Sequence, residues 1–69
     1  MIKIGLIGAG KIAETFHLPA WAQVVGAEVV ALVDPRINVA KQLGREYGVC
    51  NIFSTIDNML NSIKLDAVD

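Results

Sequence analysis

Short apolar runs alternate with stretches of helical periodicity along this chain of 69 residues. Residues 2–7 and 28–33 are almost continuously apolar, as expected for parallel strands that are covered on both faces of a sheet. Residues 49–53 predict a short third strand, and residues 65–68 predict the beginning of a fourth. The pattern therefore predicts four strands with helical segments between them.

The first interval between strands predicts two helical pieces. Residues 10–17 form the first, and Pro19 interrupts it because proline lacks a backbone N–H. Pro19 then begins a second short piece over residues 19–24, which Gly26 ends.

The second interval carries clearer end signals. Asn38 is a candidate N-cap, and Val39, Leu43 and Tyr47 repeat at spacings of four on one helix face. Gly48 stands where a helix C-terminus favours a residue in the left-handed conformation. An amphipathic helix that ends at this glycine is therefore expected.

The third interval predicts a helix that ends near Leu60. Ser54 or Thr55 can cap its N-terminus, and Asp57 is placed to complete a capping box with Ser54. The resulting order, β-α-β-α-β-α-β, predicts an α/β fold. It corresponds to the first half of a doubly wound parallel sheet with right-handed crossovers.

Composition narrows the class of protein. The chain is 54% hydrophobic and 19% charged with a net charge of −1, so neither disorder nor a nucleic-acid-binding surface is expected. The apolar runs are too short to span a bilayer, and the N-terminus does not read as a signal peptide. We therefore expect a cytoplasmic protein with no membrane partner.

Cys50 is the sole cysteine, so it forms no intrachain disulfide, and it is expected to be a buried, inert thiol in the third strand.

The turn after the first apolar run carries the candidate chemistry. Gly8, Gly10 and Ala13 fit the dinucleotide-binding fingerprint G-x-G-x-x-G/A. Gly8 would allow the tight turn from strand to helix, and Gly10 would let a phosphate approach the backbone. Ala13 would keep the helix close to the strand.

A pyrophosphate would find its donors at the start of the following helix. The backbone N–H groups of Lys11 and Ile12 are unpaired there and lie at the positive end of the helix dipole. The predicted phosphate site therefore consists of Gly8, Ala9, Gly10, Lys11 and Ile12.

An acidic residue, Asp34, follows the second strand at the distance that the fingerprint requires. Its carboxylate could accept hydrogen bonds from both hydroxyls of the adenosine ribose and would repel a 2′-phosphate, which favours NAD over NADP. Arg36 leaves NADP open, because an arginine could offset a 2′-phosphate or stack on adenine. Two alternatives remain: the glycines and Asp34 only shape a turn and cap a loop, or the turn binds FAD or S-adenosylmethionine.

The remaining chemically capable residues favour structural roles. His17 is the only histidine, so no metal cluster is predicted, and a helix-end position is favoured over a role near the cofactor. Phe16 and Trp21 are expected in the core or in an interface. Asp66 is interpreted as a strand-edge residue.

The chain also resembles a known family. Residues 2–13, His17-Leu18-Pro19-Ala20, residues 30–35 and Asp66-Ala67-Val68-Asp69 are similar to the opening of the glucose–fructose oxidoreductase / inositol dehydrogenase / rhizopine-catabolism family. The resemblance covers essentially the whole chain.

This resemblance implies an NAD(P)-dependent oxidoreductase with a Rossmann domain, which passes hydride between nicotinamide and a sugar or polyol. It implies that Gly8, Gly10, Lys11 and Ile12 hold the pyrophosphate, and that Asp34 and Arg36 meet the ribose. The family's catalytic Glu-Lys-Pro lysine, its catalytic histidine and its substrate domain lie downstream of strand four. Residues 1–69 are therefore expected to be the N-terminal part of such a domain, with no catalytic residue among them.

The alternative is a non-catalytic, nucleotide-binding or self-associating half-Rossmann protein. With the fourth strand cut short, the apolar edge of residues 2–7 is expected to be poorly covered. Exposed strand edges pair with other chains, so a homo-oligomer is predicted.

Overall fold

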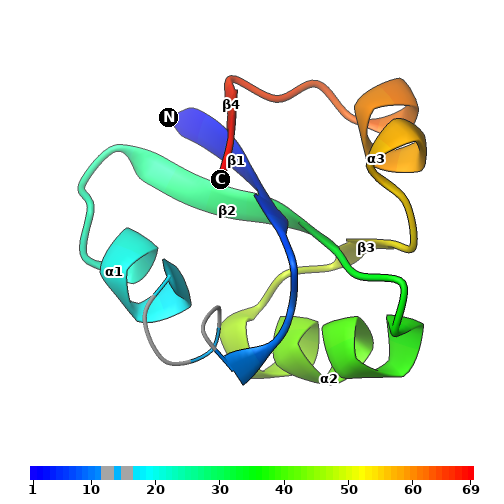
Figure 1. Ribbon diagram of the computed structural model, residues 1–69. Coiled ribbons are helices and arrows are strands. Elements are labelled where there is room, and N and C mark those ends of the chain that lie inside the picture. The colour runs from blue at the N-terminus through cyan, green and yellow to red at the C-terminus, as the bar shows by residue number, and fades with distance from the viewer. Residues whose placement is uncertain (12–13, 15–16) are drawn as a thin grey trace.

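Four parallel strands form one sheet in the order β3-β2-β1-β4 in the computed structural model. The structure describes residues 1–11, 14 and 17–69. In chain order the elements are β1 (Ile2–Ile7), α1 (Leu18–Ala22), β2 (Ala27–Val33), α2 (Ile37–Tyr47), β3 (Asn51–Phe53), α3 (Ile56–Ser62) and β4 (Ala67–Val68). Helices α1 and α2 lie on one side of the sheet and α3 on the other (Figure 1). The predicted doubly wound α/β arrangement is confirmed.

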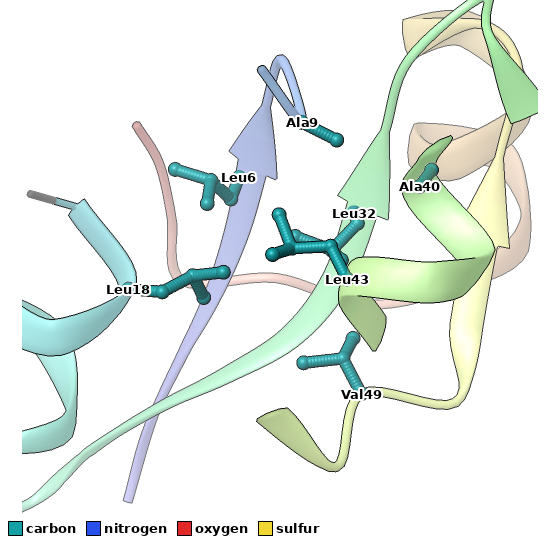
Figure 2. Packing of buried hydrophobic residues seen from close by; sticks show 7 residues of the cluster. All are labelled: Leu6, Ala9, Leu18, Leu32, Ala40, Leu43 and Val49. Atoms are coloured by element: carbon teal, nitrogen blue, oxygen red, sulfur yellow. The ribbon is translucent and has the colours of Figure 1, made fainter. Parts of the chain in front are cut away.

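Strand β2 has helices on both faces, which explains why its sequence is apolar without alternation. Leu32 packs toward α2, in the core cluster that Figure 2 shows, whereas Ala31 and Val33 pack against Met59 of α3. The pairing of β1 with β2 shifts register after Ile4, so that Val29 and Ala31 oppose consecutive residues of β1. The shift brings Val29 to the same face as Leu32.

The start of α2 corrects the sequence prediction. Its N-cap is Arg36, whose carbonyl oxygen accepts hydrogen bonds from the N–H groups of Val39 and Ala40 at 3.0 and 3.2 Å. Asn38 therefore lies inside the first turn and is exposed, and it is not the N-cap. The earlier start follows from a hydrogen bond between Arg36 N–H and the Asp34 carboxylate, which tightens the chain before the helix.

The buried face of α2 also differs from the predicted one. Ala40, Leu43 and Gly44 are buried, whereas Val39 and Tyr47 remain 38% and 39% exposed. The predicted left-handed C-cap at Gly48 is confirmed, with φ of 74°.

Other boundaries lie within a few residues of prediction. Helix α1 begins at Leu18, one residue before Pro19, and the chain turns into β2 through Gly26 at φ +87°. The helix expected over residues 10–17 includes residues 12, 13, 15 and 16, which lie outside the described part of the chain. Strand β3 begins at Asn51, so Cys50 precedes it and is exposed. The expectation of a buried thiol within the strand is wrong.

Thr55 is the cap of α3. Its Oγ1 accepts a hydrogen bond from Asn58 N–H at 3.1 Å, so the helix starts one residue too late for the predicted box between Ser54 and Asp57.

Replacing Thr55 with alanine should lower the free energy of unfolding by about 1 kcal/mol, because the Asn58 N–H loses its partner. Chemical denaturation measures the loss, and Ser54→Ala is the matched control. Equal stabilities of the two variants would contradict this assignment.

Strand β1 has partners along both edges, as its central position in the sheet requires. Asp66 N–H and Asp69 N–H donate to the carbonyl oxygens of Lys3 and Gly5, and Ile7 N–H donates to that of Asp69. The expectation of a poorly covered β1 edge is therefore wrong, while self-association stays a prediction. Asp66 also accepts the Lys3 N–H at 2.7 Å, in agreement with its interpretation as a strand-edge residue.

The helices in the described part of the chain have 5, 11 and 7 residues. None of them combines the length and the apolar character that a crossing would need.

Candidate functional site

The glycine turn stands at the carboxyl end of β1. Gly8 has φ of +90°, a conformation that side chains disfavour, and its N–H donates to Val33 O at the end of β2 at 2.7 Å. No atom would lie within 4 Å of a Cβ at Gly8, so the backbone angle and not lack of space demands glycine. The turn is thereby fixed against the end of the neighbouring strand.

Asp34 connects the two strand ends. Its side chain is 4% exposed, and its Oδ2 accepts the Ala9 N–H at 2.9 Å. Its own N–H donates to Phe53 O at 3.1 Å. The Ala9 methyl group belongs to the core cluster with Leu32 and Ala40 (Figure 2). The carboxylate is therefore held between the glycine turn and the sheet, at the end of the strands where ligands bind in such folds.

Arg36 supplies the other donors to this carboxylate. Its N–H and Nε donate to Asp34 Oδ1 at 2.7 and 3.1 Å, and its Nη2 donates to Oδ2 at 3.0 Å. The Arg36 guanidinium, aided by the Ala9 N–H, holds the pKa of Asp34 well below its usual range. The same pairing raises the pKa of Arg36. Asp34 is therefore ionised in the folded chain at neutral pH.

Gly10 faces this ion pair. A Cβ at Gly10 would lie 3.3 Å from Arg36 Nη2. Because Gly10 has no side chain, there is space between the turn and Asp34. The Arg36 guanidinium occupies part of that space in this structure. The sequence predicts a phosphate in this space, and the position of the Arg36 guanidinium next to Gly10 is a finding of the structure.

Most of the predicted site residues come together. Gly8, Ala9, Gly10, Asp34 and Arg36 surround the ends of β1 and β2, and Lys11 is exposed next to the turn. Ile12, the second predicted phosphate donor, and Ala13, the third fingerprint position, lie outside the described residues.

The bond from the Arg36 N–H to the Asp34 carboxylate matches the alternative in which Asp34 caps the following loop, whereas the pairing with the Arg36 side chain was not predicted. An aspartate that accepts the N–H two residues ahead forms an Asx-turn, and the Asp-Pro-Arg sequence carries that signal.

A second polar cluster joins α1 to the region after β4. Asp69 Oδ2 accepts Trp21 Nε1–H at 2.8 Å and lies 3.2 Å from His17 Nδ1. His17 is the N-cap residue of α1, in agreement with the helix-end interpretation. Trp21 is partly exposed at this contact and so does not lie in the core, while a place in an interface stays a prediction; Phe16 is outside the described residues.

An open groove of about 470 Å³ lies near the opposite end of the sheet. Trp21, Tyr47 and Cys50 contribute to its walls, together with Ala27–Val30 at the start of β2. In open α/β sheets, ligands bind at the carboxyl ends of the strands, so this groove is not the candidate site.

The chain is similar to known proteins in both sequence and structure. A family described as an oxidoreductase family with an NAD-binding Rossmann fold (GFO_IDH_MocA) matches residues 2–69. The chain is 36% identical over 67 residues to D-apiose dehydrogenase of Paraburkholderia graminis, covering 97% of this chain and 18% of that protein.

Two solved structures match the fold closely. An oxidoreductase from Agrobacterium radiobacter in complex with NAD+, L-tartaric acid and magnesium superposes with a TM-score of 0.90 at 28% identity, over 99% of this chain and 20% of that one. KijD10, a 3-ketoreductase from Actinomadura kijaniata in complex with NADP and TDP-benzene, gives 0.85 at 30% identity, over 97% and 20%. The chain thus spans about a fifth of the length of the proteins it matches.

Proposed function

Since the chain belongs to the oxidoreductase family with an NAD-binding Rossmann fold, we propose that it forms the cofactor-binding part of a dehydrogenase that acts on a sugar or polyol. One observation carries the proposal: the buried Asp34 carboxylate is fixed to the glycine turn at the carboxyl ends of β1 and β2. In our proposal the turn receives the phosphates and the neighbouring acid receives the ribose, which is the arrangement that dinucleotide-binding folds use.

The described residues fit an NAD molecule at two points. The turn at Gly8 and Gly10 would receive the pyrophosphate, because a Cβ at Gly10 would fill space next to the backbone. Asp34 would hold the adenosine ribose. When bound, the nicotinamide supplies the acceptor for a hydride, and the residues of this chain bind and orient the cofactor.

The sugar or polyol class rests on the relatives. D-apiose dehydrogenase is named for a sugar substrate, and KijD10 is named as a 3-ketoreductase. The oxidised group in our proposal is a carbon that carries a hydroxyl, which loses a hydride to nicotinamide and a proton to a base. We assign neither the base nor a substrate contact to a described residue of this chain.

Replacing Gly10 with valine tests the phosphate site. The added side chain would enter the space between the turn and Arg36, so we expect NAD affinity to fall by at least about tenfold. The measurement is a calorimetric titration of NAD into the full-length protein. Val25→Ala is the control, because Val25 is fully exposed before β2 at the far end of the sheet and its replacement should leave NAD affinity unchanged.

The result separates binding from catalysis. Unchanged NAD affinity in Gly10→Val, with the fold intact by circular dichroism, would remove the phosphate assignment. NAD binding without turnover of any sugar or polyol by the wild-type protein would instead support a non-catalytic, nucleotide-binding role.

A further inference from the structure

We propose that Arg36 is an internal competitor for the ribose-binding carboxylate of Asp34, and that this competition narrows the preference for NAD over NADP. The inference rests on the proposed function, because it takes Asp34 as the ribose site. Without a bound cofactor, the Arg36 side chain occupies the Asp34 carboxylate.

The competition follows from the acceptor capacity of Asp34. A carboxylate has about four lone-pair positions. Four donors already use them: the N–H groups of Ala9 and Arg36, and the Nε and Nη2 groups of Arg36. Ribose hydroxyls can therefore bind Asp34 only when some of these bonds break.

The two side-chain bonds are the ones that can break without unfolding the site. The Ala9 N–H belongs to the glycine turn, and the Arg36 N–H belongs to the residue that caps α2. The Arg36 side chain, by contrast, is 61% exposed. It can turn into water while the backbone stays in place, so NAD would displace the guanidinium alone.

NADP changes the balance because its extra phosphate is attached to the same ribose. A guanidinium released from Asp34 would meet that 2′-phosphate and regain two charge-assisted hydrogen bonds. NAD offers it no such partner. The same side chain therefore opposes NAD and assists NADP.

Arg36→Gln tests these opposite signs directly. Glutamine keeps much of the length but loses the charge and the forked donor pair. We expect the Kd for NAD to fall about fivefold and the Kd for NADP to rise about tenfold, each measured by calorimetry on the full-length protein. Arg45→Gln, on the exposed last turn of α2, is the matched control and should change neither Kd.

A second variant separates charge from geometry. Arg36→Lys keeps the positive charge but cannot form the forked pair with Asp34. It should strengthen NAD binding as Arg36→Gln does, while losing less of the NADP affinity. Because lysine is a mild replacement, this variant also guards against loss of fold.

The Arg36 Nε–H resonance in ¹⁵N NMR spectra reports the contact itself. In the free protein its exchange with water should be slowed by the bond to Asp34, and saturating NAD should speed that exchange. An unchanged or higher Kd for NAD in Arg36→Gln, or an Nε–H that NAD leaves unaffected, would overturn the competition.

Failure of the competition can be told from failure of the proposed function. If Gly10→Val abolishes NAD binding while Arg36→Gln does not strengthen it, only the competition fails. If the wild-type protein binds neither dinucleotide, the proposed function fails and the competition with it.

Discussion

Replacing Gly44 with alanine is expected to lower the free energy of unfolding by about 2 kcal/mol, although alanine is the better helix former. A Cβ at Gly44 would lie 2.5 Å from the carbonyl oxygen of Val49 and 2.8 Å from Cδ1 of Ile52. The first of these is a backbone atom between α2 and β3, so it cannot move aside by a rotamer change. Helix α2 would instead have to shift away from the sheet, loosening the contacts of Leu43.

This loss should be large relative to the total free energy of unfolding. Small domains are stabilised by only a few kcal/mol, so this substitution should remove a substantial part of the stability. Urea denaturation followed by circular dichroism measures the change. Gln42→Ala, on the exposed face of the same helix, gains helix propensity without the collision and should not be destabilised. Wild-type stability in Gly44→Ala would show that α2 does not approach β3 this closely.

The sheet could be predicted from the sequence because strands that are buried on both faces have almost continuously apolar sequences. Residues 2–7 and 28–33 are apolar without alternation, and these two runs became the neighbouring central strands. Element ends were harder, because they depend on single hydrogen bonds. The N-cap of α2 is Arg36 and not the predicted Asn38, because the Asp34 carboxylate accepts the Arg36 N–H.

The meeting of the glycine turn with Asp34 at the strand ends could be predicted from the sequence, but the side-chain pairing of Asp34 with Arg36 could not. Parallel strands bring their carboxyl ends to one edge, so Gly8 and Asp34 had to be neighbours once both runs were strands. Nothing in the spacing says whether the acid points at a ligand or at the chain. In this structure the Arg36 side chain donates to the Asp34 carboxylate, so the acid is paired within the chain. Such a contact depends on the rotamers of one long side chain, which residue spacing does not predict.

Replacing Asp34 with asparagine is expected to have a double effect. The amide has one acceptor oxygen and no charge, so donors that now meet a carboxylate would face an NH₂ group. Leaving the buried Ala9 N–H without its partner should cost about 2 kcal/mol of stability, and NAD binding should be lost with the charged ribose acceptor. The Arg36→Gln variant removes one partner of the same pair but keeps the carboxylate, so it should retain NAD binding.

The pH dependence identifies the charge as the cause. The folded pKa of Asp34 is held below that of the unfolded chain, which is about 3.9. The folded state therefore releases this proton more readily, and its stabilising effect is complete well above pH 3.9. It is lost as the pH falls below that value toward the folded pKa. In thermal unfolding between pH 6 and pH 2.5, the wild-type protein should lose more stability on acidification than Asp34→Asn. If the stability of both proteins fell equally with pH, the charge of the Asp34 carboxylate and its ion pair with Arg36 would make no contribution to stability.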